Sequence, residues 1–234
     1  MRFSCEIPVH FSDSDATGRM SPVSVMRAML ESSMQHTASV QPDDFSDIWV
    51  LYQWDVQFHR FPAPGTRLLA TTWTEGFYKF YAYRNFLLEE NGDTVAEAHT
   101  VWLLLAGDTR KPRRVPENYA GMYGAGLLDR APAAERKTQT ADLQPALELD
   151  VRSYEIDSNQ HVNNLVYADW VLESVPQEMK TQHALKRLVL TYRKQVVYPE
   201  RIIISRSGMQ DAVISHQLTD TKGELRAAAR TEWK

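Results

Sequence analysis

The sequence predicts an α+β protein in which one unit occurs twice, each unit being a long central helix wrapped by an antiparallel β-sheet. Three observations support this prediction: an internal repeat, one apolar helical segment in each half, and a series of β-rich segments after each helix. With 234 residues, the chain is long enough for one large domain or two small ones, and it can bury a core of useful size.

The internal repeat is visible at both ends of the unit. Residues 9–32 align with residues 151–174 at a shift of 142. The ends of the two halves align at a shift of 131, which places Trp102 on Trp233. The 11-residue difference between the two shifts indicates a deletion in the second copy, a change that loops tolerate. Two matching blocks in the same order predict a duplication.

Each half has one helical segment near its start. In the first half, Ser21-Pro22 is a helix start, because serine caps a helix N-terminus and proline fits the first helical position. The composition break at residues 41–47 ends this helix. In the second half, Asn163 or Asn164 can cap a helix that is apolar at nearly every position from 165 to 175. A helix that is apolar almost all round is a buried helix.

Segments rich in aromatic and β-branched residues follow each helix and predict strands. They cover residues 49–58, 67–74, 77–90, 95–105, 185–198, 201–208, 211–220 and 224–233. Asn91-Gly92 and Lys222-Gly223 are typical of tight hairpin turns. Each half therefore reads as a short strand, a helix and then antiparallel strands.

The segment between the halves, residues 116–147, is rich in Gly, Ala, Pro and polar residues and shows little periodicity. This composition is typical of a linker. We therefore expect one domain at residues 1–115 and a second at residues 148–234.

The composition excludes several classes of protein. Apolar residues make up 43% of the chain and charged residues 24%, which excludes a disordered or low-complexity protein. The net charge of −4 argues against nucleic acid as the main partner. No apolar run is long enough to span a bilayer, and the first residues lack the apolar core of a secretory signal. Because Cys5 alone permits no internal disulfide, we expect a cytoplasmic protein.

A polar motif enters the second helix. It reads Asp157-Ser158-Asn159-Gln160-His161-Val162-Asn163-Asn164 and is followed by Tyr167, Trp170 and Leu172-Glu173-Ser174. This pattern resembles the acyl-ACP thioesterases, and the stretch 102–117 resembles the end of that family's first domain. The resemblance implies a tandem hotdog fold and hydrolysis of the thioester of fatty acyl-ACP to a free fatty acid and holo-ACP. It also implies a phosphopantetheine-bearing acyl carrier protein as the partner.

The same resemblance implies the catalytic residues. The family's catalytic Asp, Asn and His correspond to Asp157, Asn159 and His161. The family's further catalytic Glu corresponds to Gln195, and the Cys that follows it in plant members corresponds to Val196. Glutamine cannot accept a proton as a base, but it can still hydrogen-bond a water molecule.

Thioester hydrolysis fits these residue types without a metal or a cofactor. His161 suits a general base because imidazole titrates near neutral pH. Asn159 can hold the carbonyl oxygen or the water, and Asp157 can orient a neighbour or activate the water itself. The start of the helix near Asn163 and Asn164 offers backbone N–H groups to a developing oxyanion. The sequence leaves the division of these roles open.

The first copy contains a rival site. At the aligned positions, Thr17 replaces Asn159 and Arg19 replaces His161, and Asp15 alone corresponds to a residue of the catalytic set. The segment 13–18 also resembles the Asp-containing loop of acyl-CoA thioesterases with a single hotdog domain.

An acidic enzyme that binds an acidic carrier protein needs a local basic surface. The sequence offers one candidate cluster at Arg110, Lys111, Arg113 and Arg114 and another at Lys186, Arg187, Arg193 and Lys194. The first half is also expected to supply the acyl-chain pocket, as the resemblance implies. The candidate pocket residues are Met26, Met29, Met34, Trp54 and Phe58.

Two other functions remain open at this point. One is an acyl-CoA thioesterase on the same fold, and the other is a degenerate hotdog protein that binds an acyl chain or carrier without hydrolysis. Gln195 favours the degenerate protein, and the complete set of Asp157, Asn159 and His161 favours an enzyme. Hotdog domains often pair, so a homodimer is a further expectation.

Overall fold

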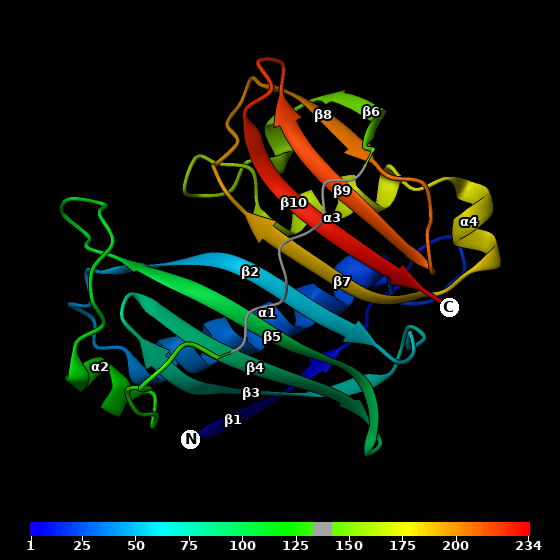
Figure 1. Cartoon of the computed structure of the whole chain (residues 1–234). Helices are drawn as coiled ribbons and strands as arrows, with labels where there is room; N and C mark the ends of the chain where they lie inside the picture. The colour runs from blue at the N-terminus through cyan, green and yellow to red at the C-terminus, as the bar shows by residue number, and fades with distance from the viewer. Residues whose placement is uncertain (133–141) are drawn as a thin grey trace. The chain divides into compact units, whose positions relative to one another are not determined.

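The computed structural model describes residues 1–132 and 142–234, and the chain divides into two compact units, Met1–Glu135 and Arg136–Lys234. Within the described residues, each unit combines a central helix with five antiparallel strands (Figure 1). This is the tandem hotdog arrangement that the sequence predicts. In the described part of the chain, no helix is long and apolar enough to cross a membrane.

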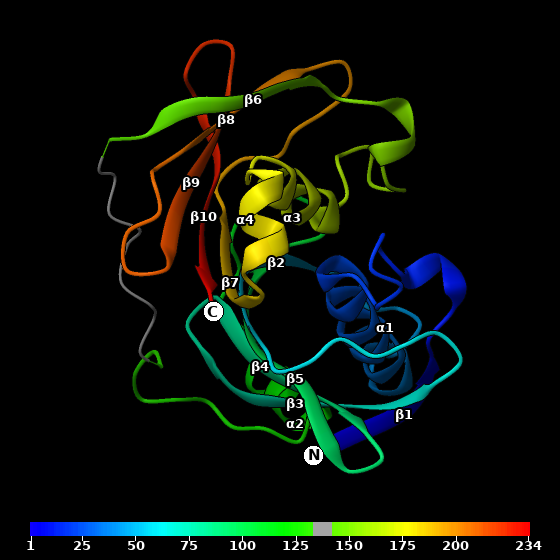
Figure 2. The same cartoon turned by 90° about the vertical axis from the view of Figure 1, so that its right-hand side faces the viewer.

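The first unit has its strands in the order β1-β3-β4-β5-β2. The elements are β1 (Arg2–Pro8), the short helix η1 (Phe11–Asp13), α1 (Pro22–Val40), β2 (Ile48–Phe58), β3 (Arg67–Tyr78), β4 (Tyr81–Glu90), β5 (Asp93–Leu105) and α2 (Glu117–Met122). Helix α1 contacts β1, β3 and β4, and Figure 2 shows it lying along one face of the sheet.

Helix α1 begins and ends where the sequence predicts. The Ser21 hydroxyl accepts a hydrogen bond from the Ser24 backbone N–H at 3.1 Å, and proline occupies the first helical position. The helix ends at Val40, before the break that begins at Gln41. Its central apolar residues Val25 and Met26 are fully buried, so α1 forms the centre of the first core.

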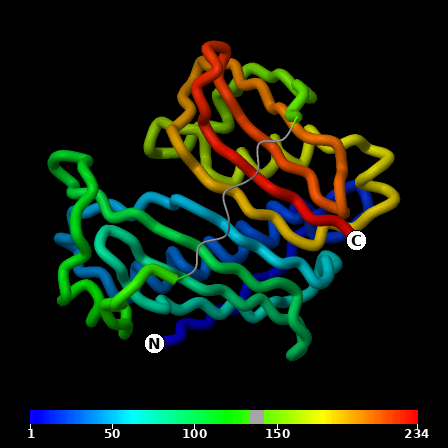
Figure 3. The backbone as a smooth tube through the Cα atoms, viewed as in Figure 1, coloured from blue at the N-terminus to red at the C-terminus, as the bar shows by residue number. Residues whose placement is uncertain are grey.

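The second unit repeats this plan with the strand order β6-β8-β9-β10-β7, as the backbone trace shows (Figure 3). Its elements are β6 (Gln144–Asp150), η2 (Ser153–Glu155), α3 (Asn164–Glu173), α4 (Gln177–Gln182), β7 (Leu185–Tyr192), β8 (Arg201–Arg206), β9 (Val213–Asp220) and β10 (Leu225–Trp233). Helix α3 packs on the sheet through Tyr167, whose ring lies 5.2 Å from that of Tyr192 on β7.

The duplication extends to individual contacts. In the first unit, the Trp102 indole donates to the Thr100 hydroxyl at 2.9 Å. In the second unit, the Trp233 indole donates to the Thr231 hydroxyl at 2.9 Å. The two pairs coincide at the shift of 131, which confirms the alignment of the two halves.

The hairpin turns also follow the prediction. Asn91 and Gly92 both have positive φ values, 54° and 87°, which is the conformation for which Asn-Gly is favoured in a two-residue hairpin. Gly223, in the corresponding turn of the second unit, has a φ of 79°.

Ordered elements occupy both ends of the expected linker. Helix α2 follows Pro116, and Ala120 and Tyr123 are buried in a cluster with Phe77 and Leu104 of the first unit. Strand β6 begins at Gln144, inside the same segment, while residues 133–141 lie outside the described residues. The boundaries 1–115, 116–147 and 148–234 stay predictions.

Candidate active site

Three of the four predicted catalytic residues, Asp157, Asn159 and His161, lie on one short loop between η2 and α3. The Asp157 backbone N–H donates to the His161 carbonyl at 2.8 Å, and the Gln160 N–H donates to the Asp157 carbonyl at 3.0 Å. The Asp157 carboxylate accepts from the Asn159 backbone N–H at 2.8 Å. Gln160 takes a left-handed conformation, with a φ of 64°, to complete the turn. These bonds fix the loop and bring Asp157, Asn159 and His161 together.

The start of α3 follows this loop directly. Asn163 is the N-cap, because its side-chain oxygen accepts from the Leu165 N–H at 2.9 Å. The Asn163 N–H donates to the Glu155 carbonyl, and the Val166 N–H donates to the Asn163 carbonyl. The N–H of Asn164 is the one in this first turn for which the described residues supply no acceptor. That donor lies at the positive end of the helix dipole.

A buried carboxylate holds the loop against the helix. The Glu155 side chain is 5% exposed and accepts from the Trp170 indole at 3.2 Å and from the Arg152 backbone N–H at 2.7 Å. Because Trp170 is on α3 and Arg152 precedes η2, this one side chain ties both ends of the η2 segment to the helix.

The segment that carries Gln195 is attached to the same region by backbone contacts. The Val162 N–H donates to the Val196 carbonyl at 2.9 Å. The Val196 N–H donates to the Tyr167 hydroxyl oxygen at 3.0 Å. Burial raises the pKa of Tyr167 to about 12, so this phenol stays neutral and keeps its geometry at neutral pH. Gln195 is therefore adjacent to a residue that contacts both the motif and α3.

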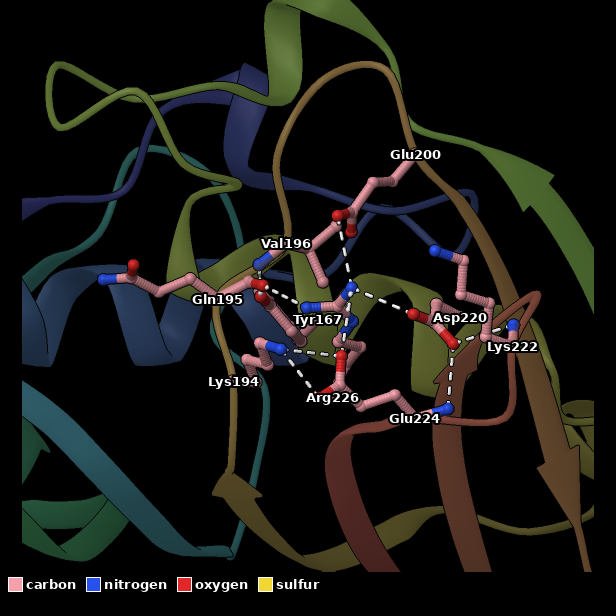
Figure 4. A network of polar contacts seen from close by, with 9 residues as sticks. All are labelled: Tyr167, Lys194, Gln195, Val196, Glu200, Asp220, Lys222, Glu224 and Arg226. Carbon is pink, nitrogen blue, oxygen red and sulfur yellow. Dashed lines mark hydrogen bonds and ion pairs between the residues drawn. The ribbon is translucent and has the colours of Figure 1, made fainter.

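Arg226 of β10 also contacts the segment that carries Gln195 (Figure 4). Its guanidinium donates to the Gln195 carbonyl at 2.9 Å, to the Glu200 carboxylate at 3.2 Å and to the Asp220 carboxylate at 3.1 Å. The side chain of Arg226 is 8% exposed, so these are contacts of a buried cation. Lys194 is outside this core and pairs with Glu224 at 2.7 Å.

The side chains of the predicted catalytic residues are available to a ligand. His161 and Asp157 are half-buried, and Asn159 and Gln195 are exposed. Figure 4 shows the Gln195 amide pointing away from Arg226 and its carboxylate partners. Among the described residues, no hydrogen bond between two side chains links Asp157, Asn159 and His161, and the Asp157 carboxylate accepts from the backbone N–H of Asn159 alone.

The first unit contains the same loop. The Asp15 N–H donates to the Arg19 carbonyl at 2.8 Å, and the Gly18 N–H donates to the Asp15 carbonyl at 3.0 Å. The Asp15 carboxylate accepts from the Thr17 N–H at 2.8 Å, as Asp157 does from Asn159. The loop geometry is thus a property of the unit, and the two copies differ in the side chains that they present.

The first unit also contains a cavity of about 240 Å³. Its walls come from α1, β2, β3, β4, β5 and the residues after α2, and they include Met34, Trp49, Phe77, Arg84, Trp102 and Tyr123. Of the five residues expected to form an acyl pocket, only Met34 lines this cavity. The other four, Met26, Met29, Trp54 and Phe58, are packed in the core and at most 1% exposed.

Comparison with known proteins gives the family. The acyl-ACP thioesterase N-terminal domain matches residues 1–123, and the C-terminal domain of the same family matches residues 138–234. The chain belongs to the acyl-ACP thioesterase family. These two matches agree with the two units of the structure, so the tandem hotdog fold and the family assignment support each other.

Individual relatives agree with the assignment. An oleoyl-acyl carrier protein thioesterase of Arabidopsis thaliana is 28% identical over 78% of this chain and 53% of its own length. An acyl-[acyl-carrier-protein] hydrolase of Cuphea viscosissima is 28% identical over 90% of this chain and 57% of its own. The chain thus spans little more than half the length of these relatives. A crystal structure of an acyl-ACP thioesterase from Bacteroides thetaiotaomicron shares the fold, with a TM-score of 0.89, 18% identity, and coverage of 100% of this chain and 98% of that chain.

The basic residues of the two candidate clusters differ in their availability. Arg110, Lys111 and Arg114 are exposed on the turn that follows β5. Arg113 instead pairs with the Asp47 carboxylate at 2.9 Å, and the Asp47 side chain is 1% exposed. In the second candidate cluster, Arg187 pairs with Glu232 at 3.4 Å and Lys194 with Glu224. The first cluster therefore has more uncommitted positive charge.

Three residues that position the loops of the candidate site were not identified as such from the sequence. Glu155 and Arg226 hold the loops through partners that are distant in the sequence. Tyr167 follows the motif in the sequence, but nothing there indicates that its hydroxyl oxygen accepts the Val196 N–H. Strand alternation would turn Arg226 away from the side of the buried Ala227 and Ala229, but the register of β10 shifts between Leu225 and Ala227, and Arg226 is buried as well.

Proposed function

We propose that this protein hydrolyses the thioester of a fatty acyl-ACP to a free fatty acid and holo-ACP, using the loop 157–161 and the start of α3. One observation carries the proposal: the loop that presents Asp157, Asn159 and His161 at the N-terminus of a buried helix occurs in a chain whose two units both match acyl-ACP thioesterase domains.

The proposed chemistry is an attack of water on the thioester carbonyl carbon. His161 takes the proton of the water, the water oxygen bonds to the carbonyl carbon, and the carbonyl oxygen becomes an oxyanion. The Asn164 N–H is the donor that stabilises this oxyanion, since the described residues supply it with no acceptor. The carbon–sulfur bond then breaks, and the phosphopantetheine thiolate takes the proton from His161.

The remaining residues have positioning roles in this proposal. Asn159 hydrogen-bonds the carbonyl oxygen or the water, and the Asp157 carboxylate keeps the turn closed by accepting the Asn159 N–H. Asn163 acts as the helix cap, so it contributes by placing the Asn164 N–H. Gln195 hydrogen-bonds the attacking water in place of a carboxylate.

We further propose that the cavity in the first unit receives the acyl chain and that Arg110, Lys111, Arg113 and Arg114 contact the acidic carrier protein. The apolar walls of the cavity, with Phe45, Ile48 and Phe77 among them, support the first assignment. The exposure of Arg110, Lys111 and Arg114 supports the second.

The test is steady-state hydrolysis of acyl-ACPs of varied chain length, with the same acyl groups on CoA for comparison. The variant His161→Ala should lower kcat by roughly 10²–10⁴-fold, which is the usual contribution of positioned acid–base catalysis. Arg19→Ala is the matched control, because Arg19 closes the same turn in the first unit. Faster turnover of acyl-CoA than of acyl-ACP would favour an acyl-CoA thioesterase, and no turnover of either would favour a non-catalytic acyl-binding protein.

The cellular compartment and the oligomeric state are also proposals. Cys5 is the single cysteine and is free, which is compatible with a reducing compartment, and we propose the cytoplasm. We propose a homodimer as the assembly, which sedimentation equilibrium can test.

A further inference from the structure

The cavity of the first unit contains a buried cation. Arg84 lies on β4, the middle strand of its sheet, and its side chain points to the core side together with Ala82 and Phe86. Arg84 is 7% exposed and lines the cavity. A charged side chain at such a position is costly unless an opposite charge or a set of acceptors compensates it.

The partners of Arg84 are all neutral. Its guanidinium contacts the His36 Nδ1 at 2.9 Å and donates to the Thr72 hydroxyl at 3.2 Å. It also lies over the Tyr123 ring, 5.6 Å from the centroid. Among the residues that the structure describes, no carboxylate pairs with Arg84. Asp47, the acidic residue of the cavity wall, is paired with Arg113.

The contact with His36 supplies no negative charge. Since a guanidinium can only donate, the His36 Nδ1 must accept, which places the proton of the neutral ring on Nε2. Burial, and then the nearby Arg84, lower the pKa of His36 to about 4, so the ring is neutral at pH 7. Burial lowers the pKa of Arg84 to about 10, which still leaves the guanidinium protonated. The cavity therefore has a positive wall without a compensating anion among the described residues.

The fold itself does not require this cation. Arg84 pairs with Thr100 in the sheet of the first unit, and Thr100 corresponds to Thr231 in the second unit. The residue that pairs with Thr231 is Ile214, which is fully buried. The same core position thus accepts an aliphatic side chain in the sister unit.

From this we infer that the preferred acyl groups carry an acceptor oxygen on the chain, as a hydroxyl, oxo or carboxylate group, and that Arg84 binds this oxygen in the cavity. The inference rests on the proposed function, in which the cavity receives the acyl chain. An unsubstituted alkyl chain would surround the guanidinium with methylene groups and offer no acceptor to the donors that His36 and Thr72 do not use. An oxygen on the chain would accept from the guanidinium while the rest of the chain contacts the apolar wall of Trp49, Phe77 and Trp102.

The experiment compares acyl-ACPs of one chain length that differ in a single group. The series contains the plain chain and chains with a hydroxyl or oxo group placed at successive carbons, together with the chain that ends in a carboxylate. We expect at least one oxygenated chain to exceed the plain chain in kcat/KM by roughly 10- to 100-fold, the range expected for a buried donor that gains an acceptor. The position and type of the best group then show whether the oxygen is neutral or anionic.

The variant Arg84→Met should remove this preference, because methionine keeps an unbranched apolar stem and offers no donor. Arg67→Met is the matched control, since Arg67 lies on the neighbouring strand β3 but is exposed and pairs with Glu6. This control should keep the wild-type preference. Thermal unfolding checks that both variants are folded, and the comparison within the wild type needs no variant at all.

Two results would overturn the inference. One is a wild-type enzyme that hydrolyses the plain chain as well as every oxygenated chain, as expected if solvent alone solvates Arg84. The other is a preference that Arg84→Met retains. The same chains are also attached to pantetheine through a non-hydrolysable amide, and their Kd values are measured by calorimetry. A chain preference in binding without hydrolysis of any acyl-ACP would refute the proposed function alone.

Discussion

Replacement of Arg226 by methionine tests whether the buried ion cluster fixes the segment that carries Gln195. The change removes the hydrogen bonds to the Gln195 carbonyl and to the Glu200 and Asp220 carboxylates, together with the ion pair to Glu224 at 3.6 Å. Because the Arg226 side chain is 8% exposed, three carboxylates would lose a buried cation. Breaking a buried pair by removal of one partner costs about 3–5 kcal/mol. That is a large part of the roughly 5–15 kcal/mol that stabilises a typical domain.

The matched control is Lys194→Met, which also removes one positive charge, from the residue next to Gln195. Lys194 pairs with Glu224, but both side chains are about half exposed, at 56% and 46%. An exposed pair contributes about 0–1 kcal/mol. Equilibrium urea unfolding of both variants measures the difference, and acyl-ACP turnover shows whether a loosened segment also lowers kcat. A loss below about 1 kcal/mol for Arg226→Met, or one equal to that of Lys194→Met, would refute the role assigned to the cluster.

Three further predictions concern the turn at Gln160, the buried His216 and the basic cluster after β5. Gln160→Gly should raise the free energy of unfolding by about 0.5–1 kcal/mol in urea titrations. Glycine adopts the observed left-handed φ without strain, and this gain exceeds the larger backbone entropy that glycine loses on folding. A loss of stability would contradict this prediction. Burial lowers the pKa of His216 to about 3, so below about pH 6.5 the unfolded chain binds a proton at this residue and the folded protein does not. The contribution of His216 to the free energy of unfolding should therefore fall by about 1.4 kcal/mol per pH unit as the pH drops from 6.5 toward 3. Urea unfolding at several pH values measures this slope, which should be smaller in His216→Phe, because Phe86 occupies the corresponding position of the first unit. Charge reversal in the basic cluster should raise KM for acyl-ACP more than for acyl-CoA, and less so at high salt, and an unchanged KM at low salt would exclude the cluster as the docking surface. The residues to change are Arg110, Lys111 and Arg114.

Gln195→Glu separates two interpretations of the departure from the family's glutamate. If Gln195 only positions the water, the nearly isosteric variant should change kcat by less than about tenfold, which corresponds to about 1.4 kcal/mol. A rise of roughly a hundredfold or more, about 2.7 kcal/mol, would instead mean that the missing carboxylate is the base. The measurement is kcat at fixed pH with the acyl-ACP that the wild type prefers.

Local chemistry made much of the fold predictable. Ser21 caps α1 and Asn91-Gly92 forms a hairpin, because each of these features depends on residues adjacent in the chain. Helix α2 was not predicted, since its six residues have no helical period long enough to detect. Ala120 of this helix and Tyr123, its C-cap, are buried against Phe77 and Leu104, which are distant in the sequence.

The site was predictable in part for the same reason. The motif at Asp157 and His161 is local, so the repeat and the resemblance located it on one loop. The contacts of Arg226 join the segment between β7 and β8 to the β9–β10 hairpin, and nothing in the spacing of those residues indicates that they meet. The prediction of the residues that line the cavity was wrong for a different reason. Residue type suggested Trp54 and Phe58, but residue type does not distinguish a residue that lines a cavity from one in the core, and both are buried in the core.

The presence of the same hydrogen-bonded turn at Asp15 and Asp157 has a consequence for how this protein could gain or lose chemistry. Its frame is made by backbone groups and one carboxylate, so the side chains at the third and fifth positions are free to vary without cost to folding. Two side chains of the turn differ between the units, Thr17 and Arg19 against Asn159 and His161. The start of the helix differs as well, because Pro22 stands where the second unit has Asn164 and has no backbone N–H to donate. A second centre of the proposed kind would therefore need changes at the helix start as well as on the turn.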